Sequence, residues 1–111
     1  MLVIISPAKK LNWDPVSLTN LTNPSFQKEA VELVDIAKNL SPKKLSDLMK
    51  ISENLAKLNF DRFNSFESKS TNKNAKPAAL AFAGDTYAGL EARTLDLESM
   101  QYAQKHLRIL S

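Results

Sequence analysis

Residues 2–10, Leu-Val-Ile-Ile-Ser-Pro-Ala-Lys-Lys, join an uninterrupted apolar run to a short basic segment. Four apolar residues in a row, three of them β-branched, are typical of a strand that is buried on both faces of a parallel or mixed sheet. Because proline cannot donate a hydrogen bond to a strand ladder, Pro7 ends the strand. Lys9 and Lys10 are therefore expected in a loop at the carboxyl edge of the sheet, where open α/β sheets bind ligands.

Two further apolar runs predict strands. Residues 78–83 are small and apolar, and the segment Gly84–Leu90 after them is expected to be a turn. Residues 107–110 follow a helix that is predicted to begin after its cap Asp96. This order predicts an α/β fold, with a mixed sheet and flanking helices. The apolar ending indicates the N-terminal part of a longer domain that covers residues 1–111 and is incomplete at its C-terminus.

The segment between the first two strands is predicted to be helical after a loop at residues 12–24 that carries Trp13. Asn23 and Pro24 have the pattern of a helix cap and first turn. One buried face of that helix is expected to hold Ala30, Leu33, Val34, Ala37 and Leu40.

Residues 41–66 predict two short helices in tandem, a helix–turn–helix hairpin. Ser41 and Ser52 are placed as the two N-caps, and Pro42 is at the first helical position. Polar residues 67–76 then predict a surface loop.

Composition is that of a globular protein, with 43% hydrophobic and 24% charged residues. The chain has no cysteine, which excludes disulfides and thiolate metal sites, and its apolar runs are too short to span a bilayer. Its net charge of +3 is unevenly distributed, because residues 38–76 contain nine basic and four acidic side chains. This basic segment predicts either a solvated face or a nucleic-acid surface.

The sequence predicts no metal site and no cofactor. Its only histidine is His106, and its two glycines are too few for a phosphate loop. Asp85 is the best candidate for an acid/base group, although an aspartate that stabilises a turn is the alternative. Lys9 is a candidate for binding phosphate, and a solvent-facing lysine is the alternative.

Four blocks of sequence resemble the YaaA peroxide-stress proteins. They occur in the family's order over the whole chain. The blocks are residues 1–9 (Met-Leu-Val-Ile-Ile-Ser-Pro-Ala-Lys), 48–63 (Leu-Met-Lys-Ile-Ser, then Leu-Ala, Asn and Arg-Phe), 82–90 (Phe-Ala-Gly-Asp-Thr-Tyr-Ala-Gly-Leu) and 104–111 (Gln-Lys-His-Leu-Arg-Ile-Leu-Ser). Lys10 and Thr86 depart from the usual family pattern.

The resemblance implies a cytoplasmic bacterial protein of the response to hydrogen peroxide, which limits iron-driven DNA damage. It implies a mixed α/β fold with a basic cleft, a helix-hairpin-helix-like element at about 41–66 and DNA binding, and no established reaction. Carried over by residue, it points to Lys9, Arg62, Asp85, Tyr87 and Arg108.

Together these observations predict a monomer that binds double-stranded DNA with little sequence preference. The expected DNA-binding residues are Lys9, Lys10, Lys43, Lys44, Lys50, Arg62 and Arg108. An alternative is an unrecognised enzyme that acts on an anionic substrate at a cleft around Lys9, Asp85, Tyr87 and Arg108. A further alternative is a truncated fragment that does not fold stably alone and whose incomplete final strand leaves an open sheet edge prone to aggregation.

Overall fold

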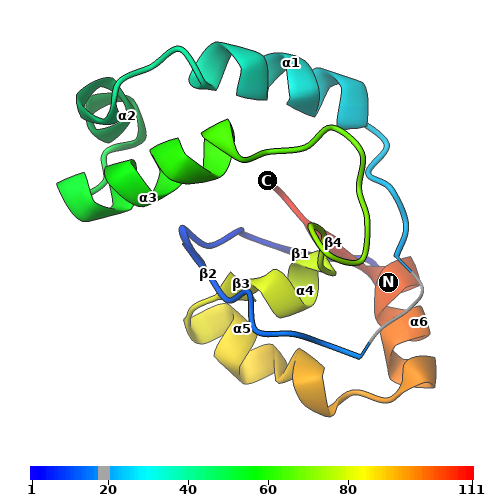
Figure 1. Cartoon of the computed structure of the whole chain (residues 1–111). Coiled ribbons are helices and arrows are strands. Elements are labelled where there is room, and N and C mark those ends of the chain that lie inside the picture. Colours follow the sequence, from blue (N-terminus) through cyan, green and yellow to red (C-terminus); the bar gives the residue numbers. More distant parts are fainter. Residues whose placement is uncertain (18–20) are drawn as a thin grey trace. The chain divides into compact units, whose positions relative to one another are not determined.

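The computed structural model describes residues 1–17 and 21–111, and the chain divides into two compact units (Figure 1). Unit 1 comprises Met1–Leu21 and Ala75–Ser111, and unit 2 comprises Thr22–Asn74. Helices combine with one parallel and one antiparallel strand pair, which confirms the predicted mixed α/β class. The elements are β1 (Val3–Ile5), β2 (Lys10–Leu11), α1 (Gln27–Ala37), α2 (Pro42–Met49), α3 (Glu53–Asn64), α4 (Ala78–Ala81), β3 (Phe82–Ala83), α5 (Asp85–Leu90), the 3-10 helix η1 (Ala92–Thr94), α6 (Leu97–His106) and β4 (Leu107–Ile109).

Strands β1 and β4 pair in parallel in unit 1, with Ile4 opposite Arg108. The ladder continues past β4, where the Leu110 amide donates to the Ile5 carbonyl at 3.0 Å. The strands predicted at both ends of the chain are therefore confirmed. The prediction that β1 is buried on both faces is wrong, because Ile4 is 56% exposed in this two-stranded pair.

Strands β2 and β3 form a separate antiparallel pair in unit 1. Lys10 pairs with Ala83, and Leu11 pairs with Phe82. The prediction that Lys10 lies in a loop is therefore wrong, since its backbone is part of this short ladder. The expected loop at 12–24 is described on both sides of residues 18–20, which lie outside the described residues.

The apolar run at 78–83 is a helical turn for most of its length, and the predicted strand is reduced to β3. Helix α4 begins after Pro77, whose carbonyl accepts hydrogen bonds from the amides of Leu80 and Ala81. Alanine has the strongest intrinsic helix preference, which favours this turn because three of the four residues of α4 are alanines. Gly84–Leu90, expected as a turn, contains helix α5.

The predicted caps of α2, α3 and α6 are confirmed. The hydroxyls of Ser41 and Ser52 accept hydrogen bonds from backbone amides of α2 and α3, each at 3.3 Å, and Asp96 accepts from the Ser99 amide at 2.8 Å. Helices α2 and α3 contact each other in unit 2, where Leu45 and Ala56 are 1% and 0% exposed. The structure thus contains the two predicted tandem helices.

Helix α1 differs from its prediction at its start and on its face. It begins at Gln27, and its N-cap residue Phe26 makes no side-chain capping bond, so Asn23 is not the cap. Val34 is half-buried, but Leu33 is 67% exposed. The apolar residues of α1 occupy more of the helix circumference than its contact with α3 covers.

Candidate functional site

The loop that precedes Lys9 is attached to α5 by a buried tyrosine in unit 1. The Tyr87 hydroxyl donates a 2.6 Å hydrogen bond to the Ser6 carbonyl oxygen, and the ring is 7% exposed. Burial raises the pKa of the Tyr87 phenol above its ordinary value, because the charged phenolate is poorly solvated there. The Phe82 ring lies 5.4 Å from the Tyr87 ring, centroid to centroid. Tyr87 is therefore a neutral anchor that joins the first and third sequence blocks.

Gly84 lies where the same two blocks meet, and its backbone has a conformation that favours glycine. Its backbone has φ 154° and ψ −178°, a conformation that is open almost only to glycine. A β-carbon placed on Gly84 would lie 3.7 Å from the Ala8 β-carbon, an ordinary contact distance. The β2–β3 ladder ends beside this point, so the segment with Lys9 and the exposed Asp85 belong to the same end of the ladder.

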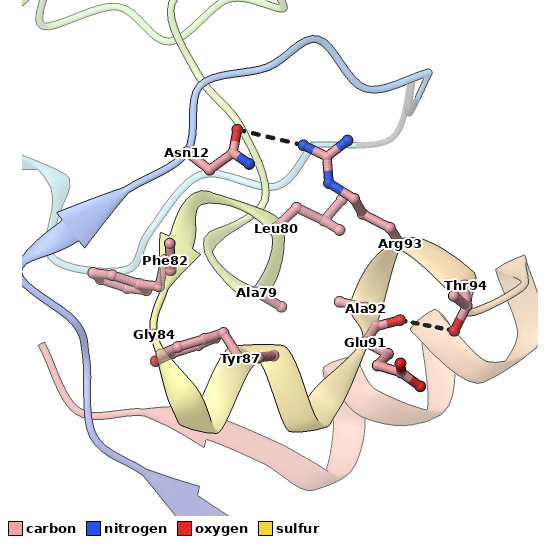
Figure 2. Close-up of a pocket in the computed structure, with 12 residues that line it drawn as sticks. Asn12, Ala79, Leu80, Phe82, Gly84, Tyr87, Glu91, Ala92, Arg93 and Thr94 are labelled. Carbon is pink, nitrogen blue, oxygen red and sulfur yellow. Dashed lines mark hydrogen bonds between the residues drawn. The ribbon is translucent and has the colours of Figure 1, made fainter.

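A shallow pocket of about 360 Å³ opens beside this anchor (Figure 2). Its floor is apolar and comes mainly from α4, β3, α5 and η1. Its polar groups include Asn12 and Arg93, whose side chains meet across the rim with a 3.4 Å hydrogen bond (Figure 2). The lining residues are Asn12, Ala79, Leu80, Phe82, Ala83, Gly84, Tyr87, Ala88, Glu91, Ala92, Arg93 and Thr94.

Lys76 and Arg93 were not identified from the sequence, although both organise the loop at this rim. The Lys76 ammonium donates to the carbonyl oxygens of Asn12 and Asp14, each at 2.8 Å. Arg93 lies 3.9 Å from the Asp14 carboxylate. Desolvation, and then the positive charge of Arg93, lower the pKa of Lys76. No sequence pattern could have indicated Lys76, because its partners are backbone carbonyls more than sixty residues away.

Arg108 lies in β4, where its guanidinium donates to the backbone carbonyls of Gln104 and Leu107 at 2.9 and 2.8 Å. The bond to Gln104 satisfies a carbonyl group in the last turn of α6, which a helix leaves without an internal partner. Arg108 therefore has a structural role in addition to any contact with an anion.

The remaining predicted basic residues belong to unit 2. Lys43 and Lys44 are exposed in the first turn of α2. Lys50, also exposed, follows the last residue of α2 with φ 54° and ψ 49°, the left-handed conformation usually held by glycine. The amides of Lys50 and Ile51 both bond to the Ser46 carbonyl, and the Ser46 hydroxyl donates to the Ile51 carbonyl at 2.7 Å. The turn between α2 and α3 thus has a glycine-like geometry without glycine.

Arg62 differs from these lysines because it is half-buried in the last turn of α3. Its Nη1 atom is buried and has no hydrogen-bond partner among the described residues. This atom cannot contact a phosphate at the surface in this arrangement. Its role in binding DNA stays a prediction.

The predicted site residues are thus divided between the units. Unit 1 holds Lys9, Lys10, Asp85, Tyr87 and Arg108, and unit 2 holds Lys43, Lys44, Lys50 and Arg62. Within residues 1–17 and 21–111, no three His, Asp or Glu side chains are grouped so that they could hold a metal ion. In the same part of the chain, no helix has the length and apolar character needed to cross a membrane.

Comparison with known proteins identifies the family. The family described as Peroxide stress protein YaaA matches residues 1–111. This chain belongs to the YaaA family. Relatives named UPF0246 protein include those of Dinoroseobacter shibae, 57% identical over 111 residues, Ruegeria pomeroyi, 53% identical over 111 residues, and Burkholderia mallei, 45% identical over 112 residues. Each match covers all of this YaaA-family chain but only 42–43% of the relative.

Proposed function

We propose that this YaaA-family chain acts in the response to hydrogen peroxide by binding double-stranded DNA through phosphate contacts, with little sequence preference. Membership of a family named for peroxide stress supports the physiological part. DNA binding in the cytoplasm would limit iron-driven damage by shielding the DNA itself.

The observation that carries the DNA-binding part is the α2–α3 pair. Two lysines occupy the exposed first turn of α2, where the positive end of the helix dipole favours an anion. Lys50 adds a third exposed cation at the turn that joins the helices. Lysine is a mobile point charge that suits phosphate oxygens, and none of these elements carries an arrangement for reading base edges. Binding is therefore expected to be weakly selective.

Fluorescence anisotropy of a labelled duplex, titrated with the chain at several salt concentrations, tests this proposal. For duplex DNA, the logarithm of the binding constant should fall with the logarithm of salt concentration by about 0.9 for each neutralised phosphate. Lys43→Gln and Lys44→Gln should each reduce that slope by about 1. Lys105→Gln in α6 removes the same charge from an exposed position and should leave the slope unchanged. A flat salt titration, or equal effects of all three variants, would contradict phosphate contacts by α2.

The enzyme alternative has less support from the geometry. Tyr87 is buried and its hydroxyl already donates a hydrogen bond to a backbone carbonyl, and the Arg108 guanidinium donates to backbone carbonyls of Gln104 and Leu107. Two of the four proposed catalytic side chains are therefore committed to structural bonds. Asp85→Asn still separates the two functions, because it should preserve or slightly raise DNA affinity and abolish a reaction that depends on the carboxylate.

A further inference from the structure

One face of the β1–β4 pair is apolar and uncovered. Ile4 and Arg108 are opposite each other in the register, so alternate residues along both strands share their face. On this face, Leu2, Ile4 and Leu110 are 54%, 56% and 63% exposed. On the opposite face, Ile5, Leu107 and Ile109 are half-buried, and Val3 is 43% exposed. We call the set Leu2, Ile4, Arg108 and Leu110 the open face.

The difference between the two faces follows from the connection between the strands. A chain that leaves one strand and returns to a parallel neighbour passes over one side of the sheet. The parts of unit 1 that follow β1 and precede β4 can therefore cover one face and leave the other open. Parallel strands in folded proteins normally have both faces covered by other elements. Three adjacent large apolar side chains, each more than half exposed, are thus an unfilled packing surface.

The length of the relatives indicates what fills this surface. The chain aligns over its whole length but covers 42% of the Dinoroseobacter shibae protein and 43% of the Ruegeria pomeroyi protein. More than half of each relative therefore lies outside the match. We propose that the open face is the surface on which this additional part of a YaaA-family protein packs, through an apolar helix or strand face with an acidic residue near Arg108. This inference does not depend on DNA binding.

A thiol-accessibility experiment tests the assignment, because the chain has no cysteine of its own. Ile4→Cys places one thiol on the open face. Leu97→Cys is the matched control, since Leu97 in α6 is 60% exposed but lies outside that face. Each variant is labelled alone and after co-expression and co-purification with the part of the Dinoroseobacter shibae protein that lies outside the match. Mass spectrometry of the 111-residue chain measures the labelling rate.

The expected result is a co-purified complex in which Ile4→Cys is labelled at least about tenfold more slowly, with Leu97→Cys unchanged. Failure of the unsubstituted chain to form a complex would overturn the proposal. An unchanged Ile4→Cys rate in the complex, or equal protection of both positions, would also overturn it. If Ile4→Cys is instead protected in the chain alone in a concentration-dependent way, a second copy covers the open face and the proposal is wrong.

Discussion

Replacement of Gly84 by alanine tests whether its backbone conformation holds the first and third sequence blocks together. At φ 154° and ψ −178°, an L-residue costs of order 1–3 kcal/mol. Steric contact adds little, because the new β-carbon would lie 3.7 Å from the Ala8 β-carbon. The whole effect should therefore come from the backbone. Gly84→Ala is expected to lower the free energy of unfolding by about 1–3 kcal/mol.

Gly89→Ala is the matched control, since it makes the same chemical change only five residues away. Gly89 lies inside α5, and a β-carbon placed on it has no neighbouring atom within 4 Å. In a helix, alanine is more favourable than glycine by about 0.5–1 kcal/mol, so Gly89→Ala should stabilise the protein. The two substitutions are thus expected to change stability in opposite directions.

Urea unfolding followed by circular dichroism measures both variants, with thermal unfolding as a second measurement. For a chain of this length that unfolds in one transition, 1 kcal/mol corresponds to about 4 °C in Tm. Gly84→Ala should therefore lower Tm by roughly 4–12 °C. Equal stability of Gly84→Ala and the unsubstituted protein would refute the argument from backbone strain. A loss of stability in Gly89→Ala would contradict the presence of open space beside Gly89 in α5.

Three other substitutions test single hydrogen bonds. Tyr87→Phe removes the bond to the Ser6 carbonyl and should cost about 1 kcal/mol at neutral pH. Because burial raises the pKa of Tyr87 above 10.0, its contribution is complete below pH 10.0 and is lost as the pH rises through the folded-state value. The difference in urea midpoint between the two proteins should shrink there, and a constant difference would contradict a buried neutral phenol. Ser52→Ala removes the cap of α3 and should cost about 1 kcal/mol, whereas Ser70→Ala in the exposed loop should cost less than about 0.5 kcal/mol in the same urea assay. The hydrogen bond from the Ser99 amide lowers the pKa of Asp96 below 3.8, so its contribution is present above pH 3.8 and is lost as the pH falls through the folded-state value. Asp96→Asn should lose this part of the acid dependence in thermal unfolding between pH 2 and 5, and an unchanged profile would exclude Asp96 as its source.

The elements that the sequence predicted well depend on local chemistry. Ser41, Ser52 and Asp96 each accept a hydrogen bond from an amide only three residues later, so each cap and its partner belong to the same short stretch of sequence. Local interactions of this kind are encoded by type and spacing. The strands found at residues 3–5 and 107–109 were predicted at 2–5 and 107–110, because runs of branched apolar residues favour extended structure.

The predictions that failed concern segments whose structure depends on distant contacts or on competing conformational preferences. The run at 78–83 could be a strand or a helical turn, and periodicity cannot separate the two in so short a segment. Leu33 was placed on a buried face of α1, but only a neighbouring helix can determine which apolar positions are covered. Composition predicted a basic segment, but it could not distinguish exposed Lys43 from half-buried Arg62.

The sequence by itself determined the caps of α2, α3 and α6, the strands β1 and β4, and the basic character of residues 38–76. It also indicated Tyr87 and Asp85 through the resemblance to a family. Only the tertiary structure decided that Tyr87 is an anchor for Ser6, that Lys76 holds the loop at Asn12, and that one face of β1 is uncovered. The physical reason is that the first two interactions connect residues more than sixty positions apart in the chain. The third property depends on which side of the strand pair the rest of unit 1 covers.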